Sequence, residues 1–466
     1  MNLVICLGAL AVLIILAYRG FSVILVAPLV AMAAVLLTEP SAVAPAYSGL
    51  FMEKLATFVK LYLPVFLLGA IFGKLIEVSG AAASIVSGIL RFFGPRQAIL
   101  ATAAVGMILT YGGVSVFVVV FATYPFAAEM FRRADIPKRL LPAVIAFSAF
   151  TITMDALPGT PQIQNIIPTA FLGTDAYAAP WLSIASAAFT FLGCYAYLEW
   201  RRLRAARAGE GYGDGHRNEP AAQPEGATIP LFLALVPLLL VGFGNRAILW
   251  LVESGYGDKA VAVLNPAAGP GAHISLDVKA NAALWAVEAA LLLGIAAVAV
   301  IGWSAIRARF AEASEQAVGG ALLAGLNTAS EYGFGGVIAA LPGFQQIAAT
   351  LSGVRDPLVN VALTTNILCG ITGSASGGLS LTLGAFADRF IAIARANDIP
   401  LEVVHRIASL ASGGMDTLPH NGAIITLLAV TGLTHRQAYR DIFAITLIKT
   451  ATAFVAIGLF YTTGLV

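Results

Sequence analysis

The sequence predicts an all-α polytopic membrane protein with about ten transmembrane helices, in an inverted 5+5 repeat with two re-entrant helical hairpins and two interrupted helices. Three observations support this prediction: the composition is apolar, long apolar stretches recur along the chain, and one short motif occurs in both halves. Of the 466 residues, 59% are hydrophobic and 11% are charged, whereas a soluble domain is about 25% charged. This composition excludes an ordinary water-soluble globule.

The apolar stretches are long enough to cross about 30 Å of hydrocarbon at about 1.5 Å per residue. The first lacks a basic leader and an A-x-A cleavage site, so we expect a membrane span there and not a signal peptide. Two further stretches, 97–130 and 358–387, carry Gly and Ser in their middles and are expected to form the re-entrant hairpins. The expected spans are residues 2–18, 21–38, 55–78, 139–171, 181–199, 229–252, 280–303, 318–341, 401–431 and 441–464.

Basic residues indicate the orientation of the chain, because cytoplasmic loops retain an excess of Arg and Lys. The strongest cluster, between Arg201 and Arg207, is expected in the cytoplasm, and both termini are then expected outside. The Gly- and Pro-rich run that follows the cluster is expected to be flexible. Residues 200–228 are thus predicted to be a cytoplasmic linker between a first repeat (1–199) and a second repeat (229–466). We expect a multi-pass protein of a bacterial cytoplasmic (inner) membrane.

Charge and cysteine content predict few partners other than the lipid bilayer. A net charge of +2 is too small to indicate nucleic acid. The three cysteines lie in apolar surroundings without C-x-x-C spacing, and the histidines are not clustered. We therefore expect no disulfide, no metal site and no cofactor.

A repeated motif links the two halves. The chain reads MDALP at Met154–Pro158 and MDTLP at Met415–Pro419, although it contains only seven methionines. Asp-Ile-Pro precedes each copy at almost the same distance, and so does a Gly/Ser-rich hairpin tip. Such agreement indicates an internal repeat. Because each half makes an odd number of full crossings, the second half must be inserted upside down.

Both motifs lie inside segments that are longer than one crossing needs, namely 139–171 and 401–431. Proline removes a backbone donor and clashes with the preceding turn, and glycine weakens a helix, so each segment is expected to be interrupted. The breakers are Pro158, Gly159, Pro161 and Pro168 in the first segment, and Pro419 and Gly422 in the second. A break at membrane depth must line a polar cavity or be buried in protein, because unpaired backbone in hydrocarbon costs several kcal/mol per group.

The midpoints of the two segments are Asp155 and Asp416, so both acids are expected near the membrane centre, where an ionisable group is a functional candidate. Together with Glu331 in LNTASEYGFGG they are the predicted proton- or ion-coupling residues. Half-helix N-termini at the breaks are expected to hold a carboxylate through free N–H groups. Glycines would let the hairpin tips approach the ligand closely, and hydroxyl and amide groups would bind a hydroxy acid. The predicted substrate-binding residues are Gly112, Gly113, Ser115, Gly159, Thr160, Gln162, Asn165, Ser374, Ser376, Gly377, His420 and Asn421.

Structural interpretations of the same residues remain open. The Pro/Gly breaks could be packing kinks, and each aspartate could cap the half helix that follows it. His420 and Glu331 could be buried, hydrogen-bonded structural residues. The Gly-rich tips could be helix-packing surfaces.

MDALPGTPQIQNIIPT from Met154 and SGGMDTLPHNGAIITLLAVTGLTHRQAY from Ser412 resemble the gluconate/proton symporter family, GntP. The resemblance runs through both halves and is nearest the hydroxybutyrate permease-like branch; GTPQIQN departs from the motif of the sugar-acid branch. It implies membership of the ion transporter superfamily, in which two hairpins and two interrupted helices form a transport domain that moves against a scaffold. It also implies a homodimer.

We therefore expect not an enzyme but a secondary active transporter with alternating access. It would import a small organic anion, such as a gluconate-like sugar acid or 3-hydroxybutyrate, while a proton neutralises Asp155 or Asp416. Sodium is the alternative coupling ion, because unwound carbonyls with Ser, Thr and Asn oxygens suit it. An intramembrane aspartyl protease is a further alternative, but a G-x-G-D signature is absent; a channel is another.

Overall fold

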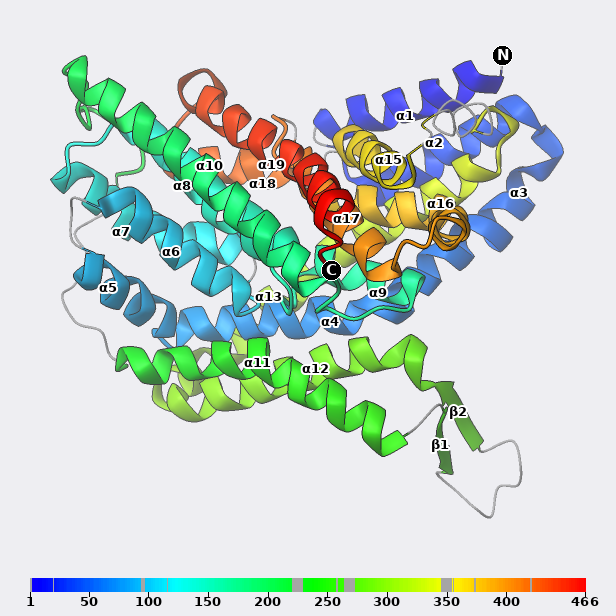
Figure 1. Cartoon of the computed structure of the whole chain (residues 1–466), viewed down its shortest axis with the longest axis horizontal. Helices are drawn as coiled ribbons and strands as arrows, with labels where there is room; N and C mark the ends of the chain where they lie inside the picture. Colours follow the sequence, from blue (N-terminus) through cyan, green and yellow to red (C-terminus); the bar gives the residue numbers. More distant parts are fainter. Residues whose placement is uncertain are drawn as a thin grey trace.

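The computed structural model describes residues 2–466 except 20, 94–96, 115, 220–228, 257–258, 264–272, 345–353, 355, 373 and 420. Two predicted site residues, Ser115 and His420, lie outside the described residues. The protein is an all-α polytopic membrane protein, as the sequence predicts (Figure 1). Seven described helical segments are long and apolar enough to cross a membrane. They are Pro40–Val78, Lys138–Ala156, Pro180–Arg207, Leu231–Tyr256, Asn281–Ile301, Ala375–Ala396 and His435–Thr463.

The first half opens with two short apolar helices, which are followed by the long helix α4. It continues with a helix that the sequence analysis did not predict, α5, and then with a helical hairpin, an interrupted helix and a final long helix. The elements are α1 (Asn2–Tyr18), α2 (Val23–Thr38), η1 (Pro40–Ala42), α3 (Val43–Ala46), η2 (Tyr47–Phe51), α4 (Met52–Val78), α5 (Ala81–Phe93), α6 (Ala98–Tyr111), α7 (Val116–Arg133), η4 (Lys138–Leu140), α8 (Leu141–Phe147), η5 (Ser148–Ala156), α9 (Ile163–Leu172) and α10 (Pro180–Arg207).

In the described residues, the second half also ends with a helical hairpin, an interrupted helix and a long helix, but it contains a two-stranded sheet. Its elements are α11 (Leu231–Tyr256), β1 (Lys259–Val263), β2 (His273–Asp277), α12 (Val278–Ile301), α13 (Trp303–Ala340), α15 (Pro357–Thr372), α16 (Ala375–Ala396), α17 (Leu401–Gly414), α18 (Gly422–Thr431) and α19 (His435–Thr463). The two strands pair antiparallel, with Lys259 opposite Asp277, in a stretch where the sequence analysis expected only a loop. The expected span 318–341 forms part of the 38-residue helix α13.

Both predicted hairpins and both predicted interruptions form where the sequence places them. Hairpin 1 is α6 with α7, and hairpin 2 is α15 with α16; the two helices of each hairpin contact each other. The first interruption separates η5 from α9, and the second separates α17 from α18. Gly113 at the tip of hairpin 1 has φ +89°, which favours glycine. Local sequence therefore decides these breaks.

Elements that correspond in the two halves pack against each other. The long helices α4 and α13 lie side by side, and α10 packs against α19 across the front of the molecule (Figure 1). The interrupted helices meet where η5 contacts α17. Each hairpin packs against the interrupted helix of its own half and also contacts that of the other half: α7 contacts α18, and α16 contacts α9. The core between them consequently contains residues from both halves of the chain.

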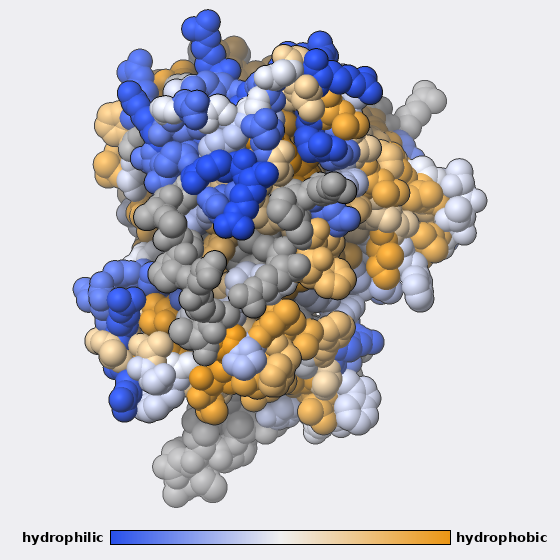
Figure 2. All heavy atoms as spheres, turned by 90° about the vertical axis from the view of Figure 1, so that its left-hand side faces the viewer, coloured by the Kyte–Doolittle hydropathy of each residue, from blue (hydrophilic) through white to orange (hydrophobic). Residues whose placement is uncertain are grey.

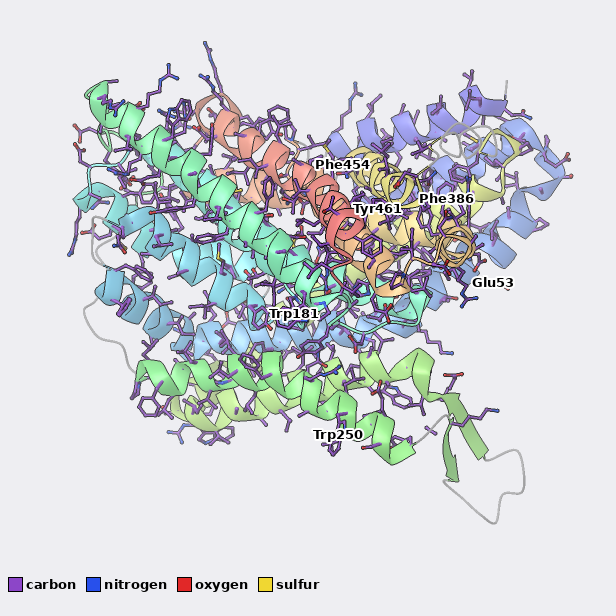
Figure 3. All side chains as sticks on the ribbon, in the orientation of Figure 1. Glu53, Trp181, Trp250, Phe386, Phe454 and Tyr461 are labelled. Atoms are coloured by element: carbon purple, nitrogen blue, oxygen red, sulfur yellow. The ribbon has the colours of Figure 1, made fainter. Side chains whose placement is uncertain are left out.

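Large apolar side chains cover the outward faces of the bundle. Trp181 on α10, Trp250 on α11 and Leu447 on α19 are each more than half exposed, and the first two are labelled in Figure 3. A soluble protein rarely exposes so much contiguous apolar surface, whereas lipid covers it at no cost. The end of the molecule where α10 finishes carries many hydrophilic side chains in the upper part of Figure 2. The distribution is that of a protein embedded in a bilayer.

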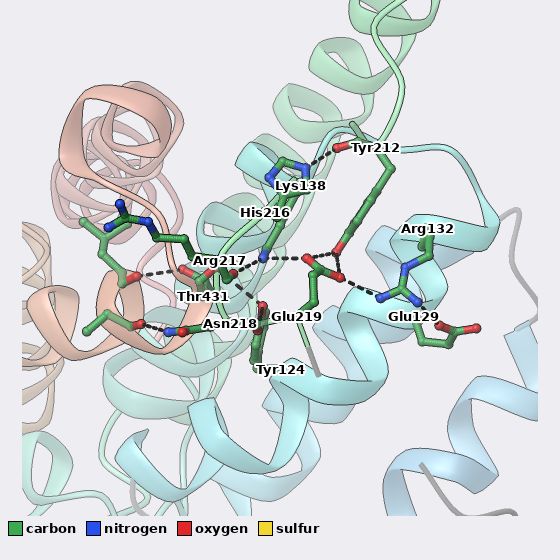
Figure 4. A network of polar contacts seen from close by, with 12 residues as sticks. Tyr124, Glu129, Arg132, Lys138, Tyr212, His216, Arg217, Asn218, Glu219 and Thr431 are labelled. Atoms are coloured by element: carbon green, nitrogen blue, oxygen red, sulfur yellow. Dashed lines mark hydrogen bonds and ion pairs between the residues drawn. The ribbon is translucent and has the colours of Figure 1, made fainter. Parts of the chain in front are cut away.

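The Gly- and Pro-rich run that the sequence analysis expects to be flexible is described as far as residue 219, and this part makes defined side-chain contacts that the analysis did not predict. Helix α10 continues to Arg207, and residues 208–219, which we call the linker segment, fold against three elements (Figure 4). The Nζ of Lys138 donates to Glu219 Oε1 at 2.7 Å and to the Arg217 carbonyl at 2.9 Å. Asn218 Nδ2 donates to the Ala429 carbonyl at 2.8 Å. The segment thus connects η4 with the end of α18.

Glu219 is the main polar anchor of the linker segment. Arg132 of α7 forms a second ion pair with it at 2.6 Å, and the Tyr212 hydroxyl donates to both of its carboxylate oxygens. Partial burial raises the pKa of Glu219, but the hydrogen bonds from Lys138, Arg132 and Tyr212 outweigh burial, so the pKa lies below the ordinary 4.5. A carboxylate with a depressed pKa stabilises the folded state above its ordinary pKa, and this contribution is lost as pH falls through the lower folded value.

We expect Glu219→Gln to loosen the linker segment, because it leaves the buried Lys138 ammonium without its carboxylate. Amide hydrogen exchange of residues 211–219 should accelerate about tenfold, as loss of a charged hydrogen bond worth about 1.5–3 kcal/mol allows. In the unaltered protein the same segment should lose protection only as pH falls below about 4.5. Glu129→Gln is the matched control, because Glu129 pairs only with exposed Arg132 and Arg133. Unchanged exchange in Glu219→Gln would contradict the prediction.

Candidate substrate and coupling site

The first interruption spans residues 157–162 and is held open by backbone contacts. Leu157 is extended at ψ 139°, and Gly159 has φ +80°. A Cβ at Gly159 would lie 2.5 Å from the Tyr177 ring, so only glycine fits there. The Gly159 amide donates to the Ala176 carbonyl at 2.8 Å. These contacts take the place of the helical hydrogen bonds that the prolines remove.

Asp155 lies in η5, a π-helical segment in which Thr151 departs from helical geometry at φ −131° and ψ −105°. Such wide turns are found frequently at functional sites. Asp155 is 4% exposed, and its Oδ2 has no hydrogen-bond partner among the described residues. It faces Gly413 on α17, where a Cβ would lie only 1.6 Å from Oδ2. The two interrupted helices consequently cross at Asp155 and Gly413.

Asp416, at the second interruption, is paired with a lysine that the sequence analysis missed. Lys449 of α19 donates from Nζ to Asp416 Oδ1 at 2.5 Å and to the Phe150 carbonyl of η5 at 2.5 Å. Both side chains of the pair are almost fully buried. A lone Lys inside the apolar span 441–464 is a signal that could have identified this residue.

A second buried cation, Arg406 of α17, stands beside Asp155. Its Nη1 donates to the Asp155 carbonyl at 3.0 Å and its Nη2 to the Ala178 carbonyl at 3.0 Å. Arg406 is fully buried, and none of its described hydrogen bonds is to a carboxylate. Two basic side chains, Arg406 and Lys449, thus stand at the breaks in addition to the half-helix N-termini that the sequence analysis proposes for carboxylate binding.

These four side chains form one charged cluster, which we call the central cluster: Asp155, Asp416, Arg406 and Lys449. Asp155 interacts electrostatically with each of the other three. With all four ionised, two positive and two negative charges balance. Taking charges out of water costs several kcal/mol per ion, so a cluster of this kind is stable only when its charges compensate one another. Adding or removing one charge changes that balance.

The other predicted residues of the first interruption gather at the tip of hairpin 1. Gln162 Nε2 donates to the Thr110 carbonyl at 2.8 Å, and Gly113 packs against Pro161. Gly112 packs against Leu238 of α11, and Thr160 Oγ1 accepts from the Gln162 amide at 3.4 Å. The tip of hairpin 1 thereby closes onto the interruption.

Two side-chain oxygens at the start of α9 lack partners. Asn165 Nδ2 donates to the Thr160 and Ala176 carbonyls, but Asn165 Oδ1 is buried without a hydrogen bond. Gln164 Oε1 is likewise buried without a hydrogen bond among the described residues. The N-terminus of α9 also has no side-chain cap, whereas Asn421 caps α18 by accepting from the Ala423 amide at 2.7 Å. The two half helices are therefore not equivalent.

The remaining predicted residues form a separate group at the tip of hairpin 2. Ser374 caps α16 by accepting from the Gly377 amide at 3.0 Å, and Ser376 lies beside Thr328 of α13. Glu331 of α13 faces Gly377. Cys369 of α15 interacts electrostatically with both Asp416 and Glu331, so this group adjoins the central cluster.

A cavity of about 380 Å³ lies beside the second interruption. This volume is within the range of about 300–1,000 Å³ that is usual for small-molecule pockets. Phe454 of α19 stands where this helix faces α15 (Figure 3). The lining residues are Leu363, Asn366, Ile367, Gly370, Met415, Thr450 and Phe454. All of these residues belong to the second half of the chain.

We expect Asp416→Asn to destabilise the protein strongly, because it leaves Lys449 buried without its counter-charge, at a cost of about 3–5 kcal/mol. The double variant Asp416→Asn with Lys449→Met should recover much of that loss. Asp155→Asn removes a charge but no hydrogen bond to Oδ2 among the described residues, so it should destabilise the protein less. Thermal unfolding in detergent measures all three. Equal destabilisation by Asp155→Asn and Asp416→Asn would show that the pairing is misassigned.

Charges buried at two interrupted helices inside a polytopic helical bundle define a class of membrane transport protein. Comparison with known proteins supports the same class. The chain is 54% identical over its whole length, and over the whole length of the relative, to the uncharacterized transporter YxjC of Bacillus subtilis (strain 168). The chain belongs to the transporter family of that protein.

Other comparisons add less. A second uncharacterized transporter, from Haemophilus influenzae (strain ATCC 51907 / DSM 11121 / KW20 / Rd), is 34% identical over 119 residues, which is 26% of each chain. Among solved structures, the YdaH transporter of Alcanivorax borkumensis, described as having an unusual topology, aligns over 92% of this chain and 90% of its own. The TM-score is 0.49 and the sequence identity 14%. No family model matches the sequence.

Proposed function

We propose that this transporter imports a small organic anion across a bacterial inner membrane by proton symport with alternating access. The substrate class is a gluconate-like sugar acid or a short hydroxycarboxylate such as 3-hydroxybutyrate. The observation that carries the proposal is the buried Asp155 carboxylate, which has an unpartnered oxygen and stands beside two buried cations.

Asp155 is the better proton carrier of the two acids. Asp416 is already neutralised by Lys449 at 2.5 Å, and protonation would break that pair. Asp155 Oδ2 receives no hydrogen bond, so a proton on it displaces no partner. The same asymmetry disfavours an aspartyl protease, in which two acids share one proton.

Charge balance links the proton to the anion. When Asp155 is protonated, the central cluster keeps two positive charges and one negative charge, so it attracts one carboxylate. When Asp155 is ionised, the cluster is already neutral and a bound anion would stand uncompensated in a low-dielectric site, where charges interact strongly. Anion and proton therefore favour each other's binding, and this reciprocal coupling is what symport requires.

Groups near Asp155 match a hydroxy acid. Arg406 donates only to backbone carbonyls, and the N-terminus of α9 offers N–H groups without a side-chain cap. Both attract a carboxylate. The unpartnered oxygens of Gln164 and Asn165 would accept hydrogen bonds from substrate hydroxyls. The resemblance to the GntP family, nearest its hydroxybutyrate permease-like branch, supports the same substrate class.

Movement follows from the arrangement of the repeats. We propose that residues 1–199 and 229–466 are the two inverted repeats, and that the hairpins with the interrupted helices move against a scaffold that includes α4 and α13. The contacts of α7 with α18 and of α16 with α9 join the moving elements of both repeats. The resemblance also supports a homodimer, and the basic end of α10 supports a cytoplasmic linker in the inner membrane.

Uptake by proteoliposomes tests the proposal. Labelled gluconate and 3-hydroxybutyrate should accumulate under an imposed pH gradient and not under a sodium gradient alone. Asp155→Asn keeps the cluster permanently at one net positive charge, so it should retain anion exchange but lose accumulation driven by the pH gradient. The matched control, Asp388→Asn on the exposed face of α16, should behave like the unaltered protein.

A second variant keeps the aspartate and changes only its surroundings. Gly413→Ala places a Cβ where the Asp155 carboxylate now lies, so uptake should fall at least tenfold. Gly458→Ala on α19, which has open space around it, should not change uptake. Accumulation by Asp155→Asn at the normal level would overturn the role of Asp155, and failure of every anion and gradient to support uptake would overturn symport.

A further inference from the structure

Glu331 of α13 is a buried acid outside the central cluster. It is 6% exposed, and its Oε2 has no hydrogen-bond partner. It lies against the first turn of α16, where a Cβ at Gly377 would be 1.4 Å from Oε2. None of the ion pairs between described residues includes Glu331. The carboxylate therefore requires some other source of positive charge.

Two simpler explanations do not account for the buried Glu331 carboxylate. The N-terminus of α16 attracts an anion, but such an interaction is worth about 0.3–1 kcal/mol, whereas an isolated buried carboxylate costs far more than that. A permanently protonated Glu331 would be neutral, but protonation alone leaves the buried Asn327 Oδ1 and Ser330 Oγ on the same helix without partners among the described residues.

The surroundings of Glu331 provide several hydroxyl and amide oxygens. Thr328, one turn before Glu331 on α13, has its Oγ1 3.4 Å from Ser376 Oγ, which in turn is 3.4 Å from Ser374 Oγ. Asn327 Oδ1 and Ser330 Oγ are buried without partners on the same stretch of helix. The described residues contain no cluster of His, Cys, Asp and Glu that would favour a transition metal. Oxygen ligands alone favour a hard cation.

Charge and spacing narrow the choice of cation. One carboxylate with neutral hydroxyls matches a monovalent ion, because a divalent one would leave a charge uncompensated. Oxygen ligands lie about 2.3–2.6 Å from a calcium-sized cation, so two ligands at right angles are about 3.4 Å apart; sodium has nearly the same radius. The two hydroxyl separations of 3.4 Å are long for hydrogen bonds but match neighbouring ligands of one ion.

We propose that Glu331 and Thr328 of α13, together with Ser374 and Ser376 of hairpin 2, bind a sodium ion. This sodium site goes beyond the proposed proton and anion symport, which depends on Asp155, and it is separate from the central cluster. Since two ligands come from α13 and two from hairpin 2, occupancy holds the tip of the hairpin against the long helix. Sodium binding would thus order hairpin 2 beside the central cluster.

The test is thermal unfolding of the full-length protein in detergent, with NaCl exchanged for choline chloride at constant ionic strength. A ligand that binds the folded state raises apparent stability by mass action, so we expect a saturable rise of about 3 °C or more with sodium. Glu331→Gln should abolish the rise. Glu288→Gln, which changes a partly buried acid on α12 outside the group, should keep it.

Two further variants keep the proposal testable if Glu331→Gln does not fold. Ser376→Ala should weaken the sodium response about tenfold, and Gly377→Ala should abolish it by displacing the carboxylate. Equal stabilisation by sodium and choline, or a sodium response that survives Glu331→Gln, would overturn the proposal. The two proposals fail separately. Asp155→Asn should keep the sodium response while it loses proton-driven uptake. Glu331→Gln should lose the sodium response while it keeps proton-driven uptake.

Discussion

The approach of Asp155 to Gly413 is the contact on which the rest of the structure depends. It lets the two interrupted helices cross with a carboxylate directly against the backbone of the opposing helix. Any larger residue at position 413 would separate η5 from α17. The separation would also displace Lys449, which reaches from α19 to the Phe150 carbonyl and to Asp416. One glycine therefore determines whether the four buried charges can compensate one another.

Helix α19 has a second role, because it braces the second interruption along its length. Lys449 pairs with Asp416, Thr446 meets Thr417 at 2.7 Å, and Thr450 donates to the Gly414 carbonyl at 2.9 Å. Unwound backbone at membrane depth is tolerated only where protein or water satisfies it. The first interruption obtains the same support from Asn165, Arg406 and Ala176. Each break is thus stabilised by residues outside it, and Arg406 comes from the other half of the chain.

We propose different roles for the two groups of polar residues, the central cluster and the group at Glu331. In our proposal, the central cluster binds a proton and an anion together, because its charges balance only in certain combinations. The proposed role of the group at Glu331 is to bind a cation, because it holds one carboxylate among hydroxyl oxygens. The linker segment adds a contact on the outer side of the same elements, since it binds both α7 and α18. A transport cycle that moves these elements must carry the linker segment with them or release it.

The sequence by itself determined the helical membrane class, the hairpins and the interruptions, because apolar length, Gly and Pro act locally on the backbone. It also identified Asp155, Asp416 and Glu331 as ionisable residues in apolar segments. Only the tertiary structure decided which charges meet: Lys449 and Asp416 are 33 residues apart and Arg406 donates to a carbonyl 251 residues away. The order of the linker segment likewise depends on Glu219 reaching Lys138, 81 residues before it. Such pairings depend on how helices pack, and no local pattern in one sequence encodes that.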